Sequence, residues 1–375
     1  MASKSVDLMT EKLINVNEVF QRIDPARFAE VMEGGLFEMM TQIITDVGTN
    51  KLPKGVWDSL PEAVQHETIF KALDDSPEFL NAFMTDIKDD VEQVFDLKHM
   101  VVTAMVANKE LLNRVFMECG AQELTFIERS GFYFGFLFGI AQMVWWYYFQ
   151  EIWVLPFCGL IVGTLTNWIA LKVIFLPIEP TPICCGAFTM HGLFLQRQDA
   201  VSELFAKINA ESILYPEAMW TSILTGPRSD KFRQMLDRHT HQFVDKMAGK
   251  LKPFVKAYLG EMEFLQMKDD IAAQIMEELP KHIYHSYDYT AEALKMEDTL
   301  CTAMKGLTYL EFEGVLHPVF EEDELKLILV GALLGAMVGV FQLLVMFGGV
   351  ENETYVIFGD SIDGHLATGC GAESA

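Results

Sequence analysis

The chain has few basic residues and lacks the short motifs that mark the common enzyme classes. Among 375 residues there are 28 Lys and Arg against 53 Asp and Glu, which gives a formal net charge of -25. A protein that binds nucleic acid needs a basic face, so this composition argues against that class. A P-loop, a dinucleotide fingerprint, a GxSxG elbow and an HExxH helix are all missing from the sequence. We therefore predict a protein that is not an enzyme and uses no cofactor.

Cysteines are also few, and the N-terminus does not resemble a signal peptide. The 6 cysteines show neither a CxxC pair nor the dense spacing of a disulfide scaffold, so free thiols are expected. Cys184 and Cys185 closely follow an apolar segment, and acylation of this pair is the alternative to an ordinary loop. The first residues, MASKSVDLMTEKLINVNEVF, lack a continuous apolar core and a cleavage site, so we expect the N-terminus to stay where it is made.

What the chain does contain is long apolar runs. The stretch from Ser130 to Pro177 carries only two charged side chains, Glu151 and Lys172. Glu151 divides it into two halves, each about as long as the roughly 20 residues that a helix needs to cross a bilayer. A third apolar run extends from Leu325 to Phe347. The sequence therefore predicts about three transmembrane helices, the first two joined by a tight polar elbow around Gln150 and Glu151.

Helical periodicity fills both flanks of these runs. Apolar residues recur at intervals of three and four, as in FAEVMEGGLFEMMTQIITDV. Asp24-Pro25 and Ser76-Pro77 resemble helix N-termini with proline in the first turn, whereas Gly34-Gly35 and Leu279-Pro280 resemble breaks. Residues 178–192 are rich in proline, glycine and cysteine and favour an irregular loop. Each flank is therefore expected to be a set of amphipathic helices.

The predicted fold class is an all-α integral membrane protein with two amphipathic helical regions on the same side of the membrane. Lys and Arg near the membrane are confined to that side, which predicts that it faces the cytoplasm, across a bacterial inner (plasma) membrane or an organelle membrane. The predicted parts are a helical region 1–128, a transmembrane hairpin 129–177, a helical region 178–322, a transmembrane helix 323–348 and a flexible tail 349–375 with a short strand at 355–358.

The first and third apolar runs share a pattern. Glycines four positions apart, followed by glutamine three positions later, occur in GFLFGIAQM and again in GAMVGVFQL, with an offset of 200 residues. A TAM tripeptide precedes each run, at 103–105 and at 302–304. Coincidence is the alternative, but the matching context favours an internal duplication whose two helices run in the same direction.

Small and polar residues inside the runs are the candidate functional residues. Glycines four apart allow two helices to approach closely in lipid, and polar side chains are costly there unless they pair. We expect the glutamines to bond to each other or to Asn167, and Lys172 to reach the interface. The predicted packing glycines are Gly135, Gly139, Gly159, Gly163, Gly331, Gly335 and Gly339. The predicted intramembrane polar residues are Gln142, Asn167, Lys172 and Gln342.

The second run and the residues after it resemble a known family. LPFCGLIVGTLTNWIALKVIFLPIEP, GLFLQRQDAVSELFAKI and FEGVLHPVFEEDELKLILVGALLGAMVGVFQ are similar to the pattern of the domain of unknown function 445 family. ERSGFYFGFLFGIAQM resembles the branch of that family with an extra membrane helix ahead of the core pattern. The resemblance covers about residues 100–347. It implies a helical membrane protein and no established reaction.

Histidines and one acidic run offer weaker candidates for metal binding. His239 with His241 and His282 with His285 have suggestive spacing, but a zinc site needs three or four converging ligands. Asp237, Asp245 and Glu278 lie nearby in the sequence in a chain full of acidic residues, so no metal site is predicted. The run at 321–324, EEDE, is interpreted as the N-terminal cap of the third apolar helix, since carboxylates are favourable at that end.

Three functional hypotheses remain open from the sequence. The first is a membrane-organising scaffold whose amphipathic regions bind lipid, a membrane protein partner or a second copy of the chain. The second is an oligomeric transporter or channel for ions or small solutes, with Gln142, Asn167 and Gln342 along its path. The third is a metal-dependent enzyme that uses His282 and His285. The first is the leading prediction.

Overall fold

The computed structural model describes residues 12–51, 57, 61–149, 151, 153–183, 188–249 and 252–346. The fold is almost entirely helical, as the periodicity predicts. The chain divides into two compact units, the first made of residues 1–115 and 199–307, the second of 116–198 and 308–375. The predicted elbow residue Gln150, the pair Cys184 and Cys185, and the predicted strand and tail lie outside the described residues.

The first unit combines both helical flanks of the sequence. Its helices before the apolar runs are α2 (Val16–Phe20), α3 (Pro25–Val31), α4 (Glu33–Lys51), α6 (Glu62–Asp89), α7 (Val91–Val94), α8 (Leu97–Ala107) and the first part of α9 (Lys109–Cys119). Those after them are α12 (Gln198–Ser212), α13 (Pro216–Thr225), α14 (Ser229–Ala248), α15 (Lys252–Leu259), α16 (Glu261–His282), η4 (Ile283–Ser286), α17 (Tyr287–Leu294) and α18 (Met296–Lys305).

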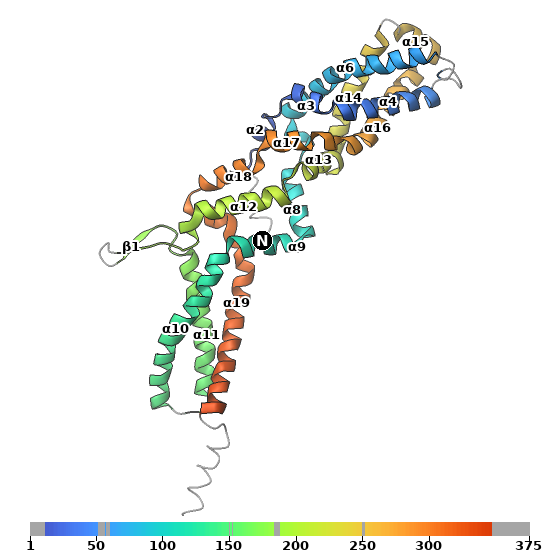
Figure 1. Ribbon diagram of the computed structural model, residues 1–375. Coiled ribbons are helices and arrows are strands. Elements are labelled where there is room, and N and C mark those ends of the chain that lie inside the picture. The colour runs from blue at the N-terminus through green and yellow to red at the C-terminus, as the bar shows by residue number, and fades with distance from the viewer. Residues whose placement is uncertain are drawn as a thin grey trace, which may run out of the picture. The chain divides into compact units, whose positions relative to one another are not determined.

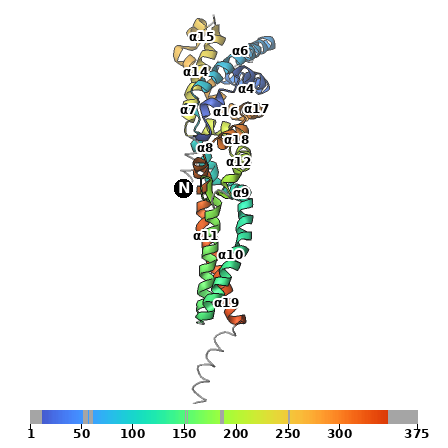
Figure 2. The ribbon, with the colours of Figure 1, turned by 90° about the vertical axis from the view of Figure 1, so that its left-hand side faces the viewer.

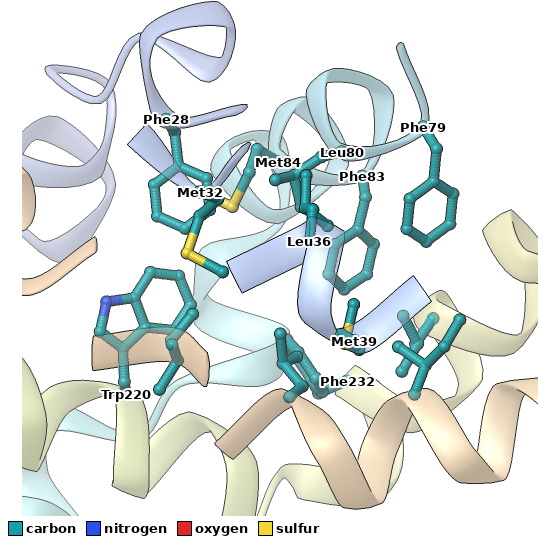
Figure 3. Close-up of a pocket in the computed structure, with 14 residues that line it drawn as sticks. Phe28, Met32, Leu36, Met39, Phe79, Leu80, Phe83, Met84, Trp220 and Phe232 are labelled. Carbon is teal, nitrogen blue, oxygen red and sulfur yellow. The ribbon is translucent and has the colours of Figure 1, made fainter. Parts of the chain in front are cut away.

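Aromatic and methionine side chains fill the core of the first unit, and they come from both flanks. Phe28 of α3 packs on Trp220 of α13, with ring centroids 5.5 Å apart. Phe83 of α6 meets Phe232 of α14 edge to face at 5.3 Å. Figure 3 shows these rings converging with Met32 from elements that are far apart in sequence. Burying them is the main contribution that holds the two flanks in one unit.

Proline positions within this unit were predicted correctly at one site and wrongly at two. Asp24 caps α3, and its side chain accepts a hydrogen bond from the backbone N–H of Ala26 at 3.0 Å, as expected for an Asp-Pro start. Pro77 instead lies inside α6, where buried Ser76 donates to the Leu73 carbonyl at 2.8 Å. Pro280 likewise lies inside α16. Burial of the surrounding apolar residues outweighs the hydrogen bond that each proline removes.

The second unit is built on three long helices, α10 (Ala121–Tyr148), α11 (Val154–Phe175) and α19 (Tyr309–Met346), which Figures 1 and 2 show side by side. A small antiparallel hairpin of β1 (Thr181–Ile183) and β2 (Phe188–Met190) follows α11, where an irregular loop was expected. The short helix η2 (Leu195–Arg197) comes after it.

The predicted cap of the third apolar run is wrong. α19 begins at Tyr309 and continues without interruption to Met346, so the EEDE run at 321–324 lies in its interior. The helix also crosses position 323, where the sequence suggested a boundary. A different capping box begins it, in which Thr308 and Glu311 exchange hydrogen bonds between side chain and backbone at 3.1 and 3.3 Å.

Two described helical segments are long and apolar enough to cross a membrane. They are Val154–Phe175, which is α11, and Glu324–Val345 within α19. The first expected span, in α10, is not among them. This helix starts with the polar residues of AQELTFIERS and ends in WWYY, whose rings carry polar atoms. Length and composition thus mark two of the three expected spans.

Large apolar side chains cover the outside of these helices. Leu325 and Leu333 of α19 are 67% and 63% exposed, and Phe157 of α11 is 52% exposed. α10 has the same character, with Phe132 75% exposed. A water-soluble protein rarely exposes so large a continuous apolar surface. A core helix would bury such residues, so their exposure favours an apolar surrounding for this part of the chain.

Candidate functional site in the apolar helices

Helices α11 and α19 touch through their glycines. A methyl group added at Gly159 would collide with the carbonyl of Gly335, and one added at Gly163 would collide with the carbonyl of Gly331. Gly339 meets the backbone of α11 at Leu155 and Pro156 in the same way. As residue numbers increase along α11, the numbers of the facing residues decrease along α19, so the two helices are antiparallel. Backbone-to-backbone packing of this kind is what small residues provide in lipid.

Gly135 and Gly139 of α10 do not take part in this packing. A methyl group added at either position would meet no atom within 4 Å among the described residues. Five of the seven predicted packing glycines are therefore brought together on one contact between α11 and α19, and the two on α10 are not.

The predicted pairing of the two glutamines is confirmed. The side-chain amide of Gln142 on α10 donates to the side-chain oxygen of Gln342 on α19 at 3.3 Å. Asn167 of α11 does not join them. Its amide donates to the backbone carbonyl of Leu327 on α19 at 2.7 Å, and it also lies against Gly331. The polar side chains of the runs thus tie helices together, α10 to α19 and α11 to α19.

Lys172 lies in the last turn of α11 and its side chain is exposed. A cation is favourable at that end of a helix, where the backbone carbonyls carry partial negative charge. The position agrees with a lysine that extends to the polar boundary of an apolar layer.

A buried ion pair, missed by the sequence analysis, lies at the start of α10. Glu123 is only 4% exposed and accepts two bonds from one guanidinium nitrogen of Arg197, at 2.8 and 3.0 Å. The adjacent Cys119 is buried, and this burial, with the charges of Glu118 and Glu123, raises the pKa of its thiol to about 12 despite Arg197. A thiol held neutral in this way is a poor nucleophile. The cluster is structural.

His317 on α19 lies between two carboxylates. Its Nδ1 is 2.6 Å from Glu313 and its Nε2 is 3.4 Å from Glu324, while its ring stacks on Phe175 of α11 with centroids 4.8 Å apart. Phe175 also packs on Phe194, which in turn packs on Phe312 of α19. The spacings of four and seven residues along one helix were the signal available in the sequence.

The other candidate histidines lie in the first unit. His239 and His241 point to different carboxylates, those of Asp86 and Asp269, each at 2.8 Å. They do not share a site, as expected for residues two apart on a helix. His282 and His285 do converge, and α4 brings Glu38 to them.

Of the three acidic residues considered as metal ligands, Asp245 and Glu278 are paired with lysines, and Asp237 interacts electrostatically with His241. Asp245 forms ion pairs with Lys252, at 2.8 Å, and with Lys268. Partial burial raises the pKa of the Asp245 carboxyl group, but the hydrogen bonds and positive charges of the two lysines lower it by more. The net pKa therefore lies below its usual value. Glu278 accepts from Gln42 at 3.1 Å and from Lys281 at 2.8 Å. Asp237 remains beside His241, and burial raises the pKa of its carboxyl group.

One cavity in the core of the first unit is too small for a ligand. It measures about 20 Å³ and is lined wholly by apolar side chains, including Met39, Phe79 and Leu236. Figure 3 shows Met39 lying among Leu36, Phe83 and Phe232 in this part of the core. A volume of roughly 10–15 Å³ already holds a single water, so this space is a packing defect of the core.

Comparison with protein-family models, with curated proteins and with solved structures finds no match for this chain. The function must therefore be argued from the geometry described above. Most of the predicted residues meet at the contact of α11 with α19. Asn167 bonds across this contact, and Gln142 and Gln342 join α19 to α10.

Proposed function

We propose that the chain is a non-enzymatic integral membrane protein that serves as a scaffold. α10, α11 and α19 form its membrane anchor, and its all-α first unit binds a protein partner. This proposal keeps the three crossings expected from the sequence, with α10 as the one that hydropathy alone does not mark. Membership of the domain of unknown function 445 family, inferred from the motifs, is consistent with it and assigns no reaction.

One observation carries the proposal. The polar side chains inside the apolar runs are used in contacts between helices, since Gln142 bonds to Gln342 and Asn167 to the Leu327 carbonyl. A transport path needs polar groups that face a passage. The described surface of the same helices is apolar, as the 63% exposure of Leu333 illustrates. Anchoring therefore accounts for the arrangement better than transport does.

Charge indicates the kind of partner. The first unit, residues 1–115 and 199–307, holds 37 Asp and Glu against 24 Lys and Arg, a formal net charge of -13, and the cytoplasmic leaflets of membranes are themselves negative. A lipid surface would repel such a unit, whereas a protein with a basic face would be attracted to it. We therefore assign the first unit a basic protein partner in preference to lipid.

The test uses the full chain in two assays. Membranes washed with alkaline carbonate should retain the protein, and crosslinking in those membranes should capture one defined partner whose yield falls as ionic strength rises. Purified protein in liposomes should carry no flux of ions or small metabolites above protein-free vesicles. Release by carbonate, or a detergent-solubilised monomer that brings no partner, would contradict the proposal. A flux that disappears in Asn167→Ala and Gln142→Leu would establish transport instead.

A further inference from the structure

Glu38, His282 and His285 form a cluster in the first unit. Each residue offers one atom suitable for a metal, and these three atoms all lie within 4.8 Å of one another. Among the residues that the structure describes, no other group of three or more His, Cys, Asp or Glu meets this condition. The cluster is independent of the proposed scaffold function.

The backbone builds this cluster from two distant parts of the chain. His282 is the last residue of α16 and His285 lies in η4, three positions later, where a helical turn places both on one side. Glu38 is on α4. A methyl group added at Gly35 would lie 2.9 Å from the His285 ring and 3.3 Å from the Cβ of His282. Only a glycine therefore lets the first turn of α4 approach the two histidines this closely.

Both histidines hold a buried ring nitrogen that has no hydrogen-bond partner among the described residues. These atoms are Nδ1 of His282 and Nε2 of His285. A buried polar atom left without a partner costs about 1–3 kcal/mol, so two in adjacent side chains need an explanation. Glu38 accounts for at most one of them, because its carboxylate is 3.4 Å from His282 Nδ1. The His285 nitrogen would still lack a partner.

The neighbouring side chains that the structure describes do not occupy the three candidate ligand atoms. The carboxylate of Glu278 is occupied by Gln42 and Lys281. The ring of Tyr284 stacks on His285 at 4.1 Å and limits the rotation of the imidazole. Glu38 is 62% exposed, so its side chain can turn toward the nitrogens at little cost. Two positioned imidazoles and one adjustable carboxylate make a ready set of donors.

We propose that Glu38, His282 and His285 bind a divalent transition-metal cation of the Zn²⁺ class. Two imidazole nitrogens and one carboxylate oxygen suit zinc, whose bonds to these atoms measure about 2.0–2.2 Å. Tetrahedral bonds of that length place ligand atoms roughly 3.4 Å apart, which is the His282 to Glu38 separation of 3.4 Å. The other separations are within 4.8 Å, so small side-chain rotations of Glu38 and the two imidazoles would bring all three atoms to bonding distance of one cation. The fourth position is open to water.

The experiment titrates the full-length protein, stripped with a chelator, with Co²⁺ and then Zn²⁺ in an excess of Ca²⁺. Calcium occupies the many surface carboxylates, because it prefers oxygen ligands. Wild-type protein should bind one equivalent of Co²⁺ with the visible absorption of a four-coordinate site, and Zn²⁺ should displace it. Absence of a saturable equivalent would overturn the proposal.

Variants separate the site from accidental binding. His282→Ala with His285→Ala should abolish the equivalent, and His66→Ala, which removes an exposed histidine elsewhere in the same unit, should not change it. Glu38→Gln should weaken binding at least about tenfold without threatening the fold, because the side chain is exposed. Gly35→Ala should weaken binding by displacing the rings. Unchanged affinity in Glu38→Gln, with metal-free melting equal to wild type, would also overturn the proposal.

Discussion

α10 and α19 carry the same glycine and glutamine pattern, yet only the glycines of α19 form a close helix contact. The glycines of α19 press against the backbone of α11, whereas Gly135 and Gly139 of α10 meet no described atom within 4 Å. The glutamines behave alike, because Gln142 and Gln342 bond to each other. Glycine spacing therefore permits close packing, and a partner with small residues of its own, here Gly159 and Gly163 of α11, is what makes it occur.

The two helices also start differently. α10 is fixed near its beginning by the buried ion pair of Glu123 with Arg197. α19 begins with the reciprocal bonds of Thr308 and Glu311 and with Phe312, which is fully buried. The helix with fewer packing contacts is thus held by a charge pair, and the well-packed helix by an ordinary cap. The following changes test this contrast.

The largest effect is expected when the ion pair is broken. Arg197→Met leaves the Glu123 carboxylate buried without its partner, which typically costs about 3–5 kcal/mol. Thr308→Ala, the matched change at the start of α19, should cost only about 1 kcal/mol. The free energy of unfolding, measured by titrating mixed micelles with a denaturing detergent, gives both values. Equal losses in the two variants would remove the contrast.

A double variant shows whether the loss comes from the unpaired charge. Glu123→Leu combined with Arg197→Met removes both partners, and such replacements are often nearly neutral. We expect the double variant to be more stable than Arg197→Met alone. A double variant that is as unstable as the single one would assign the loss to packing around Arg197 and not to charge.

A smaller effect is expected from filling the glycine contact. Gly163→Leu forces a side chain into the backbone of α19 at Gly331 and should cost about 1–3 kcal/mol or more, because the backbone cannot move aside easily. Gly139→Leu is the matched control on α10 and should cost almost nothing, since the space beside it is open. The same unfolding titration measures both. A large loss in Gly139→Leu would show that α10 packs against something through this face.

The sequence predicted the all-α class and five of the seven packing glycines correctly, and the bond between the glutamines was one of its two alternatives, because these depend on local spacing and on the cost of polar groups in hydrocarbon. It missed partners set by tertiary packing. Asn167 bonds to a backbone carbonyl, which every residue has, so no residue type in the sequence marks its partner. Glu38 lies far in sequence from His282. Pro77 was misjudged because burial of its helix outweighs a local rule.

The smallest effect concerns the one polar bond that joins the two related helices. A double-mutant cycle of Gln142→Leu and Gln342→Leu isolates their coupling. Bonds of this kind between membrane helices average about 0.6 kcal/mol, because the separated helices find other partners, and the 3.3 Å length points to a weak example. Each single variant leaves one amide without its partner, so the double variant should lose less than the two single losses together. Strictly additive losses would mean that the glutamines act separately, and the bond would then not connect α10 to α19.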